Sequence, residues 1–191
     1  MINTSSSARG FTLIELLIVI GILGILAAAV VIVLNPGELL AQSRDAQRLQ
    51  DLGTINSALA FYASTATTIT LGETASHSQA TTTNDTCQGV STAGLASTTY
   101  RDVDGTGWVG VNFNELSTVG GSPLSVLPVD PTNNTTYFYC YDGVDSAVTW
   151  ELSTTLESTK YGTTLDLDGV DGGNSATFYE IGNDPGLDIV S

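Results

Sequence analysis

The stretch GFTLIELLIVIGILGILAAAVVIVL, residues 10–34, decides the fold of this 191-residue chain. From Leu16 to Leu34 it contains no charged or strongly polar residue. As an α-helix, that part would measure roughly 28 Å, about the thickness of the hydrocarbon core of a bilayer. It is long for the apolar region of a cleaved signal peptide, and no A-x-A cleavage site follows it. We therefore predict a membrane-spanning helix over residues 11–34.

One carboxylate, Glu15, interrupts the apolar character of this block. A carboxylate near hydrocarbon is costly unless it is paired, and the block contains no basic residue. If the chain were cut before Phe11, the new ammonium of a neighbouring copy could pair with Glu15, and a wrong axial offset between stacked helices would leave a buried charge unpaired. Alternatively, Glu15 reaches the lipid headgroups near the end of the helix. The residues alone leave both interpretations open.

The sequence from Ala8 to Leu34 resembles the class III signal of type IV pilins and type II secretion pseudopilins. It has a glycine, an aromatic residue and a glutamate at fixed offsets within a long apolar run. The resemblance implies that a prepilin peptidase cleaves after Gly10 and methylates the new N-terminus at Phe11, and that Glu15 aids assembly. The chain departs from the family in its weakly basic leader and in the absence of the usual proline within the apolar block.

The same resemblance implies a structural role. The expected protein is a subunit of a type IV pilus-like filament that polymerises with copies of itself at an inner-membrane assembly platform. Before assembly it would cross the inner (cytoplasmic) membrane once, and afterwards it would belong to an extracellular pilus or a periplasmic pseudopilus. The alternatives are a type II secretion pseudopilin and a membrane-anchored adhesin or minor tip pilin. We recognise no nucleophile–base set, phosphate loop or metal triad, so we expect no enzyme.

The net charge and the number of cysteines limit which partners and which metal sites we expect. The chain has 20 acidic and 5 basic residues, for a formal net charge of −15, so we expect no direct nucleic-acid binding. The two cysteines, Cys87 and Cys140, form no CxxC pair, and with one histidine they exclude a cysteine-rich zinc site. In an exported protein we expect them to form a disulfide, with two separate thiols as the alternative.

We predict four segments: a cleaved leader at 1–10, the apolar helix at 11–34, an amphipathic second half of that helix at 35–64 and a globular head at 65–191. Asn35-Pro36-Gly37 would kink the helix, or separate two helices by a loop. The amphipathic part has an apolar stripe at three- and four-residue intervals, formed by Leu49, Leu52, Ile55, Leu59 and Tyr62. We expect its charged residues to lie elsewhere on the helix and to pair locally: Arg44, Asp45, Arg48 and Asp51.

The head begins with a Ser- and Thr-rich stretch, residues 65–99, which we expect to be a long exposed loop. Strands are predicted at Gly107–Phe113, Thr136–Asp142, Ala147–Leu156 and Thr177–Ile181. The expected fold is therefore α+β, with a long, kinked N-terminal α-helix packed on a small antiparallel β-sheet.

Two acidic, glycine-rich stretches, at 102–105 and 166–173, place aspartates at alternating positions in turns. Alternating aspartates suit calcium, which takes several oxygen ligands. Some major pseudopilins, as a family, bind calcium in a C-terminal loop, so the resemblance favours a calcium site at Asp166, Asp168 and Asp171. No glutamate completes an EF-hand loop, and solvated aspartates in turns are the alternative. We expect the protein to require no other cofactor.

Overall fold

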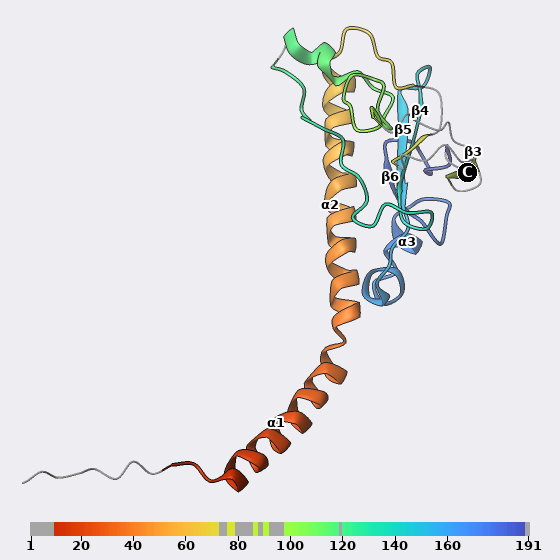
Figure 1. Cartoon of the computed structure of the whole chain (residues 1–191). Helices are drawn as coiled ribbons and strands as arrows, with labels where there is room; N and C mark the ends of the chain where they lie inside the picture. Colours follow the sequence, from red (N-terminus) through yellow and green to blue (C-terminus); the bar gives the residue numbers. More distant parts are fainter. Residues whose placement is uncertain are drawn as a thin grey trace, which may run out of the picture. The chain divides into compact units, whose positions relative to one another are not determined.

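The computed structural model describes residues 10–72, 76–78, 86–87, 90–91, 98–118 and 120–189. The chain divides into two compact units, Met1–Leu39 and Leu40–Ser191. The first unit contains the apolar helix α1, and the second contains most of helix α2 together with the sheet (Figure 1).

Helix α1 spans Leu13–Leu34 and is aliphatic apart from Glu15 and two glycines. It continues unbroken through Gly21 and Gly24, although glycine lowers helix propensity. None of its 22 residues is buried. By length and composition, it lies in the one helical segment of the described residues that is apolar enough to cross a membrane.

Helix α2 spans Pro36–Thr65 and follows α1 directly. The residue between the two helices, Asn35, has a left-handed backbone with φ 40° and ψ 72°. Pro36 has no amide hydrogen with which to continue the hydrogen-bond ladder of α1. The amide of Leu39 donates to the carbonyl oxygen of Asn35 at 3.3 Å, so the helical path resumes at once. The long N-terminal helix is thus interrupted at Asn35, and no loop separates its two parts.

One face of α2 is buried at alternating four- and three-residue intervals, as expected of a helix that faces a core. The buried positions on this face are Ala41, Asp45, Arg48, Leu52, Ile55, Leu59 and Tyr62. Its apolar part confirms the predicted stripe, except that Leu49 is only half-buried. The prediction that Asp45 and Arg48 lie elsewhere on the helix is wrong, because both occupy the buried face.

The head contains a four-stranded antiparallel sheet in the order β1-β4-β5-β6 (Figure 1). Its strands are β1 (Ser76–His77), β4 (Tyr139–Val144), β5 (Thr149–Thr154) and β6 (Tyr179–Gly182). The last three begin and end within three residues of predicted strands. A separate two-stranded sheet pairs β2 (Thr86–Cys87) with β3 (Val90–Ser91). The predicted α+β fold is confirmed.

The main core is formed by α2, one face of the sheet and the irregular segment before β4. Its largest members are Trp108, Tyr62, Phe113, Tyr139, Tyr141 and Trp150. The polar ends of two aromatic residues reach α2. Trp150 Nε1 donates to Asn56 Oδ1 at 2.8 Å, and the Tyr139 hydroxyl donates to Asp51 Oδ2 at 2.9 Å. These aromatic residues therefore contribute apolar contact and also a satisfied hydrogen bond to the packing of α2.

The predicted strand at Gly107–Phe113 is wrong. This segment is irregular apart from an isolated bridge between Asp104 and Asn112, and the 3-10 helix η1 (Phe113–Thr118) follows it. Its apolar side chains are nevertheless fully buried, which explains the strand-like pattern. Gly107 packs so closely that a Cβ there would collide with the carbonyl oxygen of Asp102. Close backbone packing therefore replaces strand pairing here.

The prediction that residues 65–99 form an exposed loop fails for several described residues of that range. Leu71 is fully buried, its amide donates to Asp145 Oδ1 at 2.6 Å, and its carbonyl oxygen accepts from the Tyr141 hydroxyl at 2.7 Å. Ser76 and Ser78 are also buried, and β1 joins the main sheet. Two short helices, η2 (Lys160–Thr164) and α3 (Leu167–Val170), complete the described head between β5 and β6.

Candidate functional site

The predicted cleavage site, Gly10–Phe11, precedes α1 outside any regular element. Both residues are exposed, and the side chain of Phe11 is 87% exposed. A Cβ added at Gly10 would meet nothing within 4 Å, so the fold itself does not require glycine there. The residues before Gly10 lie outside the described part of the chain.

Glu15 forms a capping box with Thr12 at the start of α1. The Thr12 amide donates to Glu15 Oε2 at 2.9 Å, and the Thr12 hydroxyl donates to the same oxygen at 2.8 Å. In return, the Glu15 amide donates to the Thr12 hydroxyl oxygen at 3.3 Å. Two amides that a helix start leaves free are thereby satisfied. The role of Thr12 was not predicted, although T-x-x-E at residues 12–15 is the pattern of a capping box.

The rest of α1 offers a continuous apolar surface. Its large aliphatic residues are 47–82% exposed, and none is buried by the residues that the structure describes. Exposing such a surface to water is unfavourable, and contact with lipid or with other apolar helices removes it from water. The carboxylate of Glu15 therefore lies at one end of a surface that must leave water.

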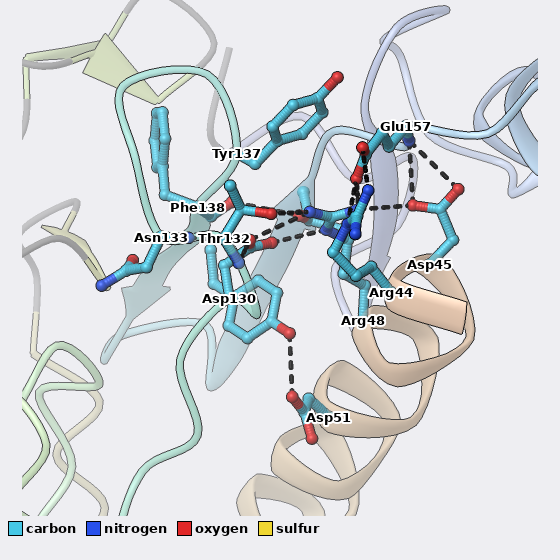
Figure 2. Close-up of polar contacts among 12 residues, drawn as sticks. Arg44, Asp45, Arg48, Asp51, Asp130, Thr132, Asn133, Tyr137, Phe138 and Glu157 are labelled. Atoms are coloured by element: carbon cyan, nitrogen blue, oxygen red, sulfur yellow. Dashed lines mark hydrogen bonds and ion pairs between the residues drawn. The ribbon is translucent and has the colours of Figure 1, made fainter. Parts of the chain in front are cut away.

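A second polar site lies where α2 enters the head, and Figure 2 shows its side chains. Arg48 is fully buried and pairs with Asp130 through two contacts, Nε–Oδ2 at 2.6 Å and Nη2–Oδ1 at 3.0 Å. Its Nη1 lies 2.7 Å from Asp45 Oδ1 and 3.4 Å from Glu157 Oε2. The ring of Tyr137 covers the guanidinium, with its centroid 4.7 Å away. We call Arg44, Asp45, Arg48, Asp130 and Glu157 the ion cluster.

The carboxylates of the ion cluster also hold backbone amides. Asp45 accepts from the amide of Glu157 at 2.9 Å and from that of Ser158 at 2.7 Å. Asp130 Oδ1 accepts from the amides of Thr132 at 2.7 Å and Asn133 at 3.1 Å. The cluster thus joins α2 to two connections of the head that are distant in sequence.

The ion cluster combines two guanidinium groups with three carboxylates. Burial alone would lower the pKa of Arg48, but its hydrogen bonds to Asp130 and Asp45 and their charges outweigh burial and raise this pKa above its ordinary value. At the rim, the hydrogen bonds from Arg44 lower the pKa of Glu157. These shifts favour the charged forms of Arg48 and Glu157 at neutral pH. The geometry of the cluster serves to fix α2 in the head.

Cys87 and Cys140 are joined by a disulfide across a sequence separation of 53 residues, with their Cα atoms 5.7 Å apart. Both are buried and form a small apolar cluster with Phe138. Since side chains alternate along β4, this cluster occupies the face of the sheet opposite Tyr139 and Tyr141. In the chain-entropy model, closing a loop of this length stabilises the fold by about 4 kcal/mol.

The three aspartates of the predicted calcium site are not gathered around a common point. Among the described residues, no group of three His, Cys, Asp or Glu side chains could hold a metal ion. Asp171 accepts from the amides of Gly173 at 3.0 Å and Glu180 at 2.6 Å. Asp168 is 8% exposed, and its Oδ1 has no hydrogen-bond partner. Burial, with a smaller effect of Asp166 and Asp171, raises the pKa of Asp168. Calcium binding here stays a prediction.

Comparison with known proteins gives one match, at the N-terminus. Residues 5–31 match the protein family described as the prokaryotic N-terminal methylation motif. No curated protein and no solved structure matches the chain significantly. The matched range contains the predicted cleavage site at Gly10–Phe11, the capping box and most of α1, and it leaves the head outside.

This match has consequences for the function of the chain. The motif supports a type IV pilin-like or pseudopilin subunit, which is a structural class and not an enzymatic one. It implies processing by a prepilin peptidase and polymerisation, and together with the apolar α1 it indicates membrane anchoring before assembly. The N-terminal segment of this chain is the class III prepilin signal of the type IV pilin and pseudopilin family.

Proposed function

We propose that the chain is the structural subunit of a type IV pilus-like filament, cleaved after Gly10, methylated at Phe11 and polymerised through α1. The observation that carries this proposal is the composition of α1. It is a helix of 22 residues without a buried side chain, and its single charge lies five residues after the cleavage site. Such a helix is stable in lipid, and it is equally stable against the same helix of other copies.

The capping box supports a two-stage role for Glu15. Before cleavage, the carboxylate accepts two hydrogen bonds from Thr12, so Glu15 does not enter the membrane without hydrogen-bond partners. Cleavage creates an ammonium at Phe11. During assembly, the ammonium of a neighbouring subunit offers Glu15 a charge-assisted partner, which is stronger than the neutral donors of Thr12. A neighbour at the wrong axial offset would leave both charges unpaired, so the pair selects the register.

The substitution Glu15→Ala tests this role in cells that assemble the filament. We expect the variant to be inserted and cleaved normally, as judged by membrane fractionation and N-terminal mass. We expect the number of filaments in electron micrographs to fall by roughly tenfold or more, because each added subunit loses the pairing of a buried charge. Glu38→Ala, which removes a carboxylate beyond the apolar block, is the matched control and should assemble normally. A normal number of filaments from Glu15→Ala would refute the proposed pairing.

A further inference from the structure

We infer that an open groove beside α2 is the surface on which the head of a second copy of this chain docks, an inference that rests on the proposed function. The groove lies between α2 and the connection that follows η1, and its volume is about 510 Å³. Its walls include Leu49, Gly53, Thr54 and Ser57 from α2, and Pro123 and Leu124 from the connection. All of these residues belong to the head unit.

The groove depends on small side chains at the middle of α2. A Cβ added at Gly53 would meet nothing within 4 Å, so packing inside the chain does not require glycine there. Glycine within a helix costs about 1 kcal/mol relative to alanine. Thr54 and Ser57 are also small, and their hydroxyl groups bond back to carbonyl oxygens of α2 itself. An outside segment can therefore approach the helix backbone closely at this face without losing a hydrogen bond of the head.

The distribution of charge on the chain favours a second copy of the chain as the occupant of the groove. The groove has no charged lining residue, although the chain as a whole has 20 acidic and 5 basic residues. Of those five cations, Arg9 would leave with the leader, and Arg44 and Arg48 are engaged in the ion cluster. Two heads therefore repel each other over most contacts, with a range of about 10 Å at 0.1 M salt. An uncharged face is where a second copy meets least repulsion, whereas a basic partner would favour the carboxylates outside the groove.

The rim of the groove supports the same occupant. Phe61, four residues after Ser57 on the same side of α2, is 42% exposed. Its side chain continues the apolar surface of the helix beyond the walls. A groove cannot fill itself, so it must accept a different surface of the next copy. Head-to-tail contacts of this kind repeat into an open helical array unless they close into a ring.

Cysteine accessibility tests the inference with the full chain. Ser57→Cys places a thiol in the groove, and Ser146→Cys places one in the exposed turn after β4 as the matched control. The native cysteines are joined in the disulfide and do not compete for a maleimide reagent. We expect Ser57→Cys to react with maleimide in detergent-dispersed subunits and at least about tenfold more slowly in sheared filaments, because a docked head excludes the reagent. Ser146→Cys should react similarly in both states.

The outcomes separate this inference from the proposed function. Equal labelling of Ser57→Cys in filaments and in dispersed subunits would overturn the docking of a head in the groove, and the filament itself would stand. Protection already present in dispersed subunits would mean a different occupant and would overturn it as well. Absence of wild-type filaments would refute the proposed function. If Ser57→Cys blocks assembly but keeps the wild-type melting temperature, and Ser146→Cys assembles, the groove is required for assembly and the inference is supported.

Discussion

At the residue scale, Arg48 has the largest expected effect on the stability of the head. The substitution Arg48→Ala would leave Asp45 and Asp130 buried without their shared cation, and we expect a loss of about 3–5 kcal/mol in the free energy of unfolding. Urea or thermal unfolding of the detergent-solubilised chain measures this loss. Arg44→Ala is the control, because that side chain is 33% exposed and its pairing contributes about 1 kcal/mol or less. Equal losses in the two variants would contradict a buried role for Arg48.

A second residue-scale prediction concerns Val148, in the turn between β4 and β5. Its φ of 57° is left-handed, a conformation that a β-branched residue adopts only with strain. We expect Val148→Gly to raise the free energy of unfolding by about 1 kcal/mol, because glycine removes that strain at a half-buried position. Ala147→Gly, one residue earlier, relieves no positive φ and should be neutral or destabilising. Destabilisation by Val148→Gly in the same unfolding assay would contradict the strained turn.

At the element scale, the two halves of α2 show what the sequence could predict and what it could not. The apolar half was predictable, because Leu52, Ile55, Leu59 and Tyr62 repeat at the period of a buried helix face. The charged half was missed, because charged residues ordinarily mark the solvent side of a helix. Continuing the same four-three spacing backwards from Leu52 reaches Arg48, Asp45 and Ala41, which is the one sequence signal of their burial.

Long-range partners explain the remaining differences between prediction and structure. Asp130 and Glu157 lie 82 and 109 residues from Arg48, and no local pattern relates them to it. The segment Gly107–Phe113 resembled a strand because it is rich in aromatic and β-branched residues, but burial of these residues in the core accounts for that composition. The capping box at residues 12–15 could have been predicted from the sequence, because its residues interact across a single helical turn. Local interactions were thus the predictable part of the site.

A further prediction concerns Asp168, in the short helix α3, and the dependence of folding stability on pH. Burial raises the pKa of Asp168 above 3.8, its ordinary value, so the folded state holds this proton to higher pH than the unfolded state does. Between those two pKa values the native protein binds more protons, and the contribution of Asp168 to stability falls as pH rises. We expect Asp168→Asn to remove this decline and to raise the melting temperature at neutral pH in the presence of a chelator.

Melting curves from pH 3.5 to 7, with and without calcium, check this prediction. Asp102→Asn, at an exposed aspartate in another turn, is the control and should follow the wild type. If the predicted calcium site exists, calcium will raise the melting temperature of the wild type and not that of Asp168→Asn, because the ion needs the carboxylate. A pH dependence that is the same in Asp168→Asn and in the wild type would contradict a costly buried charge.

At the scale of the whole molecule, the two units differ in how much of their apolar surface is buried. The first contains the apolar helix, with one charge, and the predicted cleavage site, and none of the 22 residues of α1 is buried in the part of the chain that the structure describes. The second has its own core and the ion cluster, which fix α2 within the head, and a disulfide between Cys87 and Cys140. In the proposed function α1 drives assembly, and in the further inference the groove would add an uncharged contact between otherwise repelling heads.

Processing of the N-terminus is central to this account, and the mass of the N-terminal peptide from filaments sheared off the cell surface tests it most directly. A Gly10→Leu variant is the control and should keep its leader, because in the proposed function the peptidase requires this glycine, whereas the fold does not. For the wild type, we expect a peptide that begins at Phe11 and carries one added methyl group. A chain in the sheared material that keeps residues 1–10, or that begins at any residue other than Phe11, would contradict the account.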